Sequence, residues 1–177
     1  MKTNIRTLVF LLIATLAGAV AASGQAVSLA DIGHDVFKSD ADGFEIAVPH
    51  DCFKVTPTET GRAYVCDLKE GRVVVIVDVV VTPINTDEEL AMYLAGFGKT
   101  LGTQKNVKVL RQTPTHLGDY RGAAFQLTVD GNNAVVNTLC WGKSVITMSG
   151  EVNSTDPNAG KLIDTAVQSF ALTAKPK

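Results

Sequence analysis

The sequence has few histidines and cysteines, two residue types that are common in metal sites and among catalytic residues. It contains three histidines and three cysteines among 177 residues, and His34, His50 and His116 do not have the spacing of helical metal ligands. It has no HExxH, no G-x-S-x-G elbow, no P-loop and no dinucleotide-binding glycine pattern. These absences predict no catalytic residue, no metal site and no cofactor.

Long runs of like charge are also missing. The formal net charge is −2 at pH 7, and the acidic residues gather only in the short stretch TDEEL. Proteins that bind nucleic acid or anionic membranes carry basic patches, because lysine and arginine neutralise phosphate. We therefore expect neither nucleic acid nor an anionic membrane surface as a partner. A protein partner and a small ligand both stay open.

An apolar run opens the chain. Lys2 and Arg6 precede apolar residues 8–22, and small residues follow in AVAASG, which is the order of a secretory signal peptide. A retained anchor is the alternative, but the run is shorter than the ~20 residues that span a bilayer. We predict a signal peptide at residues 1–24, export to the periplasm or extracellular space, and no membrane span after cleavage.

Three cysteines permit one intramolecular disulfide. Cys52 and Cys66 flank two strand-like stretches joined at PTETG, and a register that sets Thr56 opposite Arg62 also sets the two cysteines opposite each other. Closing a loop of ~15 residues stabilises by ~3 kcal/mol in the chain-entropy model. A free cysteine also serves as a small buried hydrophobe, so both interpretations of this pair stay open. Cys140 is predicted to be a core thiol.

The stretch GRVVVIVDVVVTP, residues 71–83, is apolar on both alternating faces of a strand. Such a pattern is typical of a strand that is covered on both sides. Asp78 is its exception. An unpaired buried carboxylate would be protonated or cost several kcal/mol, so Asp78 is either a paired structural residue or a functional acid.

Two helices are predicted. TDEELAMYLAGFGKTLG starts with a capping box of Thr86 and Glu89 and stops at Gly102. DPNAGKLIDTAVQSFAL starts with Asp156 as N-cap and Pro157 as the first helical residue. The apolar stripes are Leu90, Leu94, Phe97 and Leu101 in the first helix and Leu162, Ile163, Ala166, Val167 and Phe170 in the second.

Short alternating stretches supply four strands before the first helix and four strands between the helices. The last two of these strands are joined by a tight turn at Gly142-Lys143. This order predicts an α+β fold, in which a largely antiparallel β-sheet is covered by helices on both faces, as an α/β/α sandwich. We expect a lead-in segment at residues 25–41 and one domain at residues 42–177.

The stretch DGFEIAVPHDCFKV resembles the opening of PsbP-like domains, through Phe44, Ile46, Pro49 and Phe53. The capped helix after a long apolar strand and the ending AVQSFAL are also similar to that family. The resemblance covers about residues 42–173. It implies an antiparallel sheet sandwiched between helices, in a class that includes photosystem accessory subunits, the Mog nuclear-transport factor and exported bacterial proteins of unknown role. As a rule these are binding or assembly proteins.

The resemblance and the missing motifs together predict an exported, non-catalytic accessory or binding protein of the cell envelope or extracellular space. The alternative is a small-ligand-binding protein or minor hydrolase with a cleft near Asp78 and the loop THLGDYRG. In that loop His116, Tyr120 and Arg121 bring imidazole, phenol and guanidinium groups close in sequence. A polar surface loop explains the same residues. One pocket that gathers these groups would favour the alternative.

Overall fold

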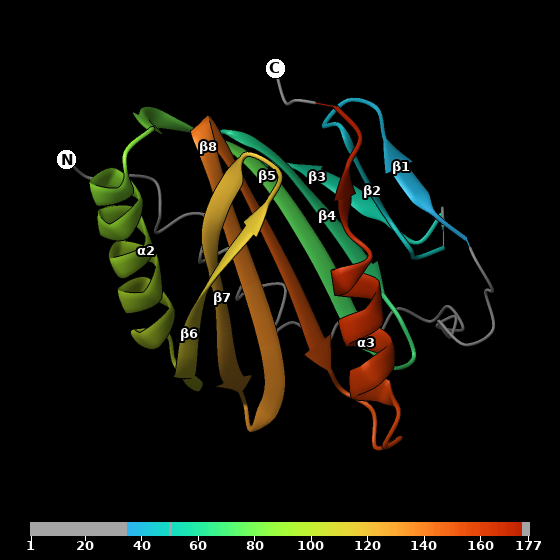
Figure 1. The fold of residues 1–177 in the computed structure, drawn as a ribbon. Coiled ribbons are helices and arrows are strands. Elements are labelled where there is room, and N and C mark those ends of the chain that lie inside the picture. Colours follow the sequence, from blue (N-terminus) through green and yellow to red (C-terminus); the bar gives the residue numbers. More distant parts are fainter. Residues whose placement is uncertain (1–34, 50, 175–177) are drawn as a thin grey trace.

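The main feature of the molecule is an antiparallel sheet of six strands. The computed structural model describes residues 35–49 and 51–174, so the predicted signal peptide lies outside the described residues. The strand order is β3-β4-β5-β8-β7-β6 (Figure 1), and every neighbouring pair is antiparallel. Three short strands form a second sheet in the order β1-β2-β9. The sequence-based expectation of largely antiparallel strands with two helices is confirmed.

The element bounds follow the chain from the small sheet into the large one. The strands are β1 (Phe37–Ser39), β2 (Phe44–Ile46), β3 (Lys54–Pro57), β4 (Gly61–Asp67), β5 (Gly71–Ile84), β6 (Val107–Leu117), β7 (Tyr120–Val129), β8 (Asn132–Val152) and β9 (Ala171–Leu172). Helix α2 (Asp87–Gly102) connects β5 to the edge strand β6, and helix α3 (Ala159–Gln168) follows β8.

Strand β8 doubles back on itself. Its residues 132–140 pair with β7, whereas its residues 142–152 pair with β5. Gly142 has a φ of 57°, which glycine adopts without steric cost. The hydroxyl oxygens of Thr138 and Thr147 lie 3.3 Å apart across the bend, and Figure 1 shows the ribbon rising to the bend and returning. The tight turn predicted at Gly142 is confirmed.

Strand β5 is interior to the sheet and its two faces meet two different cores. Val74 and Ile76 belong to a core that includes the buried side chains of α2, here called the α2 core. Val73 and Val75 belong to a second core that includes the buried side chains of α3 and of the small sheet, here called the α3 core. All four side chains are 0% exposed. The apolar residues on both faces of β5 are therefore buried in packed cores.

Helix α2 begins where its capping box predicts. The Thr86 hydroxyl accepts a hydrogen bond from the Glu89 N–H at 3.2 Å, and the Glu89 carboxylate accepts one from the Thr86 N–H at 2.9 Å. The helix also ends at Gly102 as predicted, but Gly102 is its last helical residue and Thr103, with a φ of −88°, is the C-cap. Gly102 therefore does not supply a left-handed stop.

Helix α3 begins later than the sequence predicts. The Asp156 carboxylate accepts the Asn158 N–H at 2.8 Å in a turn before the helix, and Asn158 is the N-cap without a side-chain capping bond. Aspartate makes such local turns readily, which explains why the capping motif misplaced the start. The helix then packs closely over Gly150 of β8, where an added Cβ would lie 2.6 Å from Cγ2 of Ile163.

The small sheet was not predicted. Strand β1 falls inside the expected lead-in segment, residues 25–41, and pairs with β2. The hydroxyl of buried Tyr64, in β4, is hydrogen-bonded to Ser39 and to Asp42, and this ties the small sheet to the large one. A strand of three residues is too short for an alternating pattern to reveal it, and its pairing with β2 across a short turn identifies it in the structure.

Candidate functional site

Two adjoining hollows form a groove along one side of α3. The first has a volume of about 380 Å³ and lies among β6, β7, β8 and the C-terminal half of α3. The second has a volume of about 420 Å³ and continues past the start of α3. Val135 and Asp164 line both hollows, which shows that they adjoin. We call the combined feature the α3 groove.

The groove exists because α3 covers only part of its face of the sheet. The helix packs mainly on β8 and also on β5, and the close approach at Gly150 holds it there. Beyond the helix, Gln126 of β7 stands opposite Val135 of β8, and both residues line the groove. The floor of the groove is therefore the uncovered part of a sheet face.

The lining of the groove combines amide side chains with an apolar floor. Its amides are Gln126, Asn132, Asn133, Asn137 and Gln168, and its main apolar residues are Leu117, Val135, Leu139, Met148, Val152, Val167 and Phe170. Asp156 and Asp164 are its carboxylates, and no lysine or arginine is among the described residues that line either hollow. The groove can thus offer paired donors and acceptors without a fixed positive charge.

The sequence does contain a signal for this groove. In β7, Ala123, Phe125, Leu127 and Val129 are buried in the α2 core, while the alternate positions on the opposite face are Gly122, Ala124, Gln126 and Thr128. A strand covered on both faces would be apolar on both. The polar and small residues of this second face therefore indicate a surface that the last helix leaves open.

The four residues of the predicted cleft do not come together in one pocket. Arg121 of β7 is ion-paired with Asp87 at the start of α2, whereas the Tyr120 hydroxyl bonds to Ser144 and its ring belongs to the α3 core. Asp78 and Arg121 stand opposite Val145 and Cys140 of β8, respectively, so the two segments of β8 separate them. Adjacent residues of a strand point to opposite faces, which sequence proximity alone conceals.

His116 is the one member of the predicted set that borders the α3 groove. It pairs in register with Arg121 near the end of the β6–β7 hairpin. The side chains of Asp78, Tyr120 and Arg121 line neither hollow. The predicted cleft is therefore replaced, as a candidate site, by the groove on the α3 side of the sheet.

Asp78 has a structural environment. Its side chain is 5% exposed, and the hydroxyls of Thr58 and Thr60 each donate to its Oδ1 atom at 2.8 Å. These threonines belong to the turn between β3 and β4, so the carboxylate fastens that turn to β5. Gly61 lies directly opposite Asp78, and a Cβ there would come within 1.9 Å of the Val77 carbonyl oxygen.

Replacing Asp78 with valine is expected to destabilise the fold. Two half-buried hydroxyls would lose a carboxylate acceptor, and hydrogen bonds to a charged group contribute about 1.5–3 kcal/mol each. We expect a loss of about 3 kcal/mol in the free energy of unfolding by urea titration, the lower end for two such bonds, and a smaller loss for Asp78→Asn, which keeps an acceptor oxygen. Thr58→Val with Thr60→Val should reproduce most of the effect. Unchanged stability in Asp78→Val would contradict the structural role.

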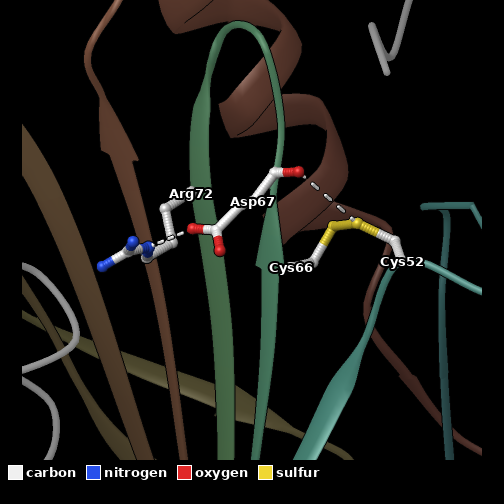
Figure 2. The surroundings of a disulfide bond; sticks show 4 residues. All are labelled: Cys52, Cys66, Asp67 and Arg72. Atoms are coloured by element: carbon white, nitrogen blue, oxygen red, sulfur yellow. Dashed lines mark hydrogen bonds and ion pairs between the residues drawn. A yellow bond between two sulfur atoms is a disulfide. The ribbon is translucent and has the colours of Figure 1, made fainter. Parts of the chain in front are cut away.

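Cys52 and Cys66 form a disulfide, with a Cα–Cα distance of 5.1 Å (Figure 2). The register between β3 and β4 differs by one residue from the predicted one, because Thr56 stands opposite Ala63 and not Arg62. Cys52 precedes β3 in a turn, with its N–H bonded to the Pro49 carbonyl. Cys52 therefore lies before the first paired residue of β3, and its side chain reaches Cys66 from this turn and not from a position in the β3–β4 ladder.

Two interactions flank the disulfide. The side chain of Asp67, the residue after Cys66, accepts a hydrogen bond from Arg72 Nε of β5 at 2.6 Å. The main-chain carbonyl oxygen of Asp67 lies 4.0 Å from the sulfur of Cys52, and Figure 2 draws both interactions. The third cysteine, Cys140, is buried and free, and burial raises the pKa of its thiol to about 12. A thiol with so high a pKa has almost no thiolate near neutral pH, so it is a poor nucleophile.

Glu151 is a buried carboxylate away from the groove. It stands opposite Arg72 in the β5–β8 pair and is 8% exposed. Burial raises its pKa to about 7, Arg72 acts in the opposite direction, and Asp130 adds to the rise. Its pKa in the unfolded chain is near the ordinary value of 4.5, so the folded state favours the protonated form. This contribution to stability is present below about pH 4.5 and is lost as the pH rises through about 7.

Glu151→Gln should remove this pH dependence, because the amide stays neutral. Relative to the parent chain, we expect the variant to gain about 2 kcal/mol in free energy of unfolding between pH 5 and pH 8. Urea titrations at both pH values measure this difference. Glu59→Gln, which changes an exposed carboxylate, is the matched control with no such gain. If the difference in free energy of unfolding between Glu151→Gln and the parent is the same at pH 5 and pH 8, as expected for the control, the burial of Glu151 is contradicted.

Two classes of site are not found in the described parts of the chain. Across residues 35–49 and 51–174, no group of three or more histidine, cysteine, aspartate or glutamate side chains could hold a metal ion. In the same residues, neither helix has the length and apolar character needed to cross a membrane.

Comparison with known proteins identifies the fold. No protein-family model matches the chain, and no curated protein matches its sequence. The solution structure of cyanobacterial PsbP (CyanoP) from Synechocystis is similar over 88% of this chain and 98% of that one, with 12% identity and a TM-score of 0.53. LpqN from Mycobacterium tuberculosis, described as involved in cell envelope biogenesis, aligns over 85% of this chain and 100% of its own, with 13% identity and a TM-score of 0.43. The chain thus has a PsbP-like fold.

Proposed function

We propose that this chain is an exported, non-catalytic binding protein whose binding site is the α3 groove. The observation that carries the proposal is the open groove itself, with hollows of about 380 and 420 Å³ lined by amides and apolar side chains. Ligand sites combine an apolar surface with a few polar groups that fix orientation, and their volumes lie in this range. The groove also lies on ordered strands and one helix, which hold its side chains in place.

Export is supported by two independent features. The first 24 residues have the three-part order of a signal peptide. The disulfide between Cys52 and Cys66 suits an oxidising compartment, since thiols in the cytosol are kept reduced. Together they favour the periplasm or the extracellular space as the site of action.

The partners and the solvent exposure of the candidate catalytic side chains favour a binding role without catalysis over a hydrolase. Tyr120 and Arg121 are occupied by Ser144 and Asp87. In the groove, Asp156 and Asp164 are exposed to water, whereas the acid of a glycosidase is shielded from it. The minor hydrolase therefore stays the second candidate, and the search for shortened products described below tests it.

We infer that helices cover both faces of the large sheet, which the separate α2 and α3 cores support. An accessory role in assembly, of the kind that PsbP-like proteins have as a rule, and a kinship with Mog stay predictions. At 12% identity the likeness to cyanobacterial PsbP concerns the fold alone.

Native mass spectrometry of the protein purified from its own host tests the binding role. We expect a retained ligand or partner that is lost in Asn137→Trp, because an indole in place of the amide would fill the first hollow. Gln112→Trp places the same bulk at an exposed position of β6 outside the groove lining and should keep the bound species. Equal retention in both variants, or no bound species in the parent chain, would refute the groove as the binding site.

A further inference from the structure

We infer that the α3 groove binds a neutral oligosaccharide, with a sugar ring packed against Trp141 at the end of the groove. This inference rests on the proposed binding role of the groove and adds the chemical class of its ligand. It combines three observations: the charge of the lining, the nature of its polar groups and the position of the only tryptophan.

The charge of the groove disfavours an anionic ligand. Neither hollow is lined by lysine or arginine among the described residues, while Asp156 and Asp164 contribute carboxylates. A phosphate, a nucleotide or an acidic peptide would meet these carboxylates without a lysine or arginine to offset them, and His116 is the one basic side chain among the lining residues. A neutral ligand has no such penalty.

The polar groups of the groove suit hydroxyl groups. Gln126, Asn133, Asn137 and Gln168 each carry an amide, which donates through its nitrogen and accepts through its oxygen. A sugar hydroxyl also donates and accepts hydrogen bonds, so an amide side chain can bind it either as donor or as acceptor. These amides lie on β7, β8 and α3, on both sides of the groove, and can contact successive sugar units.

An extended peptide is a poorer match for the same surface. Peptides commonly bind to sheets by adding a strand at a free edge, where main-chain donors and acceptors are available. The floor of the groove is instead mainly the face of β7 and β8, whose main chains pair with their neighbours. The edge strand β6 contributes only its last residues, Thr115–Leu117, and these pair with β7. A peptide main chain would have side-chain amides as its chief hydrogen-bonding partners in the groove.

Trp141 lies beyond the lining of the two hollows, on the same face of β8 as the groove. It lies two residues after Leu139, which lines the first hollow, and residues two apart share a face of a strand. The indole is 39% exposed, and its ring centroid is 6.1 Å from that of Tyr120. The C–H bonds on one face of a sugar ring carry partial positive charge, which the negative face of an aromatic ring attracts.

The length of the surface favours a chain of sugars. From Asn133 to Trp141 the first segment of β8 covers eight steps, or about 26 Å at ~3.3 Å each. A monosaccharide would occupy only a part of this length. A tetrasaccharide is therefore the smallest probe that we expect to contact both the amides and the indole.

Fluorescence of Trp141 measures this binding directly, because the chain contains no other tryptophan. The full chain, expressed with its N-terminal segment, is titrated with cellotetraose, maltotetraose and N-acetylchitotetraose, with tetragalacturonate as the anionic comparison. We expect a saturable change of emission with at least one neutral tetrasaccharide and none with tetragalacturonate. Gln126→Ala and Asn137→Ala should each weaken binding about tenfold, the effect of one lost hydrogen bond.

Gln112→Ala is the matched control, since it removes an exposed amide from β6 outside the groove lining; its affinity should stay within about twofold of the parent. No response to any neutral tetrasaccharide, equal weakening by Gln112→Ala and Gln126→Ala, or tighter binding of tetragalacturonate would each overturn the inference. If the native ligand is nevertheless lost in Asn137→Trp, the binding role of the groove stands and its ligand belongs to another class. Chromatography of the incubated sugars detects shortened products, which would show a hydrolase.

Discussion

Phe97→Ala is expected to lower the free energy of unfolding by about 3–5 kcal/mol, the usual cost of removing a buried phenylalanine. Phe97 is 0% exposed in the α2 core, and its ring lies 6.3 Å from that of Tyr93 and 5.4 Å from that of Phe125. The backbone of α2 and the sheet restrict any collapse around the missing ring, so most of the cavity should persist. Urea titration with circular dichroism measures the loss.

Ile163→Ala is the corresponding change in the α3 core, where Ile163 is 1% exposed. We expect a cost of about 2–5 kcal/mol. The two residues belong to different cores, so the costs of Phe97→Ala and Ile163→Ala should add within about 0.5 kcal/mol in the double variant. Met92→Ala, at an exposed position of α2, should change stability by no more than about 0.5 kcal/mol. A strongly non-additive double variant would show that the two cores are one.

Loss of the disulfide is expected to have the second large effect. In Cys52→Ser with Cys66→Ser, the unfolded chain regains the freedom of a loop with a sequence separation of 14. The chain-entropy model gives about 3 kcal/mol for a loop of this size. Because Cys66 is 0% exposed, its replacement by serine also buries a hydroxyl, which adds to the cost. Urea titrations of the parent chain with and without dithiothreitol separate the two contributions.

Thiol counting supplies the control for this prediction. The oxidised chain should show no reactive thiol when folded and one when denatured, because Cys140 is free and buried. Cys140→Ala should leave none in either state and should keep the response to dithiothreitol. Three thiols in the denatured, unreduced chain, or a parent chain whose stability is unaffected by reduction, would contradict the disulfide.

The elements that the sequence predicts best are those with strong local signals. The capping box places the start of α2 because Thr86 and Glu89 need only each other's backbone. The valine-rich stretch places β5 because its two faces carry the same apolar pattern. By contrast, β1 and β9 have only three and two residues, too few to show an alternating pattern. Strand β1 pairs with β2 in a short hairpin, whereas the pairing of β9 with β2 joins residues distant in sequence.

The candidate site is harder to predict because it is the part of a sheet face that α3 leaves uncovered. The groove follows from the position of α3 over Gly150. The polar and small residues on the second face of β7 indicate an uncovered surface, but they do not show how far the helix extends across the sheet. Sequence proximity was misleading for Tyr120 and Arg121, whose side chains leave opposite faces of β7. Asp78 shows the complementary case, since its partners Thr58 and Thr60 become visible only once the β3–β4 turn meets β5.

Hydrogen exchange of the backbone amides tests most directly the claim that the α3 groove is the working surface of this protein. The purified chain is compared alone and after incubation with the exported fraction of its own host. The account predicts slower exchange in residues 132–140 of β8 and in α3, and unchanged exchange in α2. Protection confined to α2 or to the β3 edge, or no protection anywhere, would contradict it.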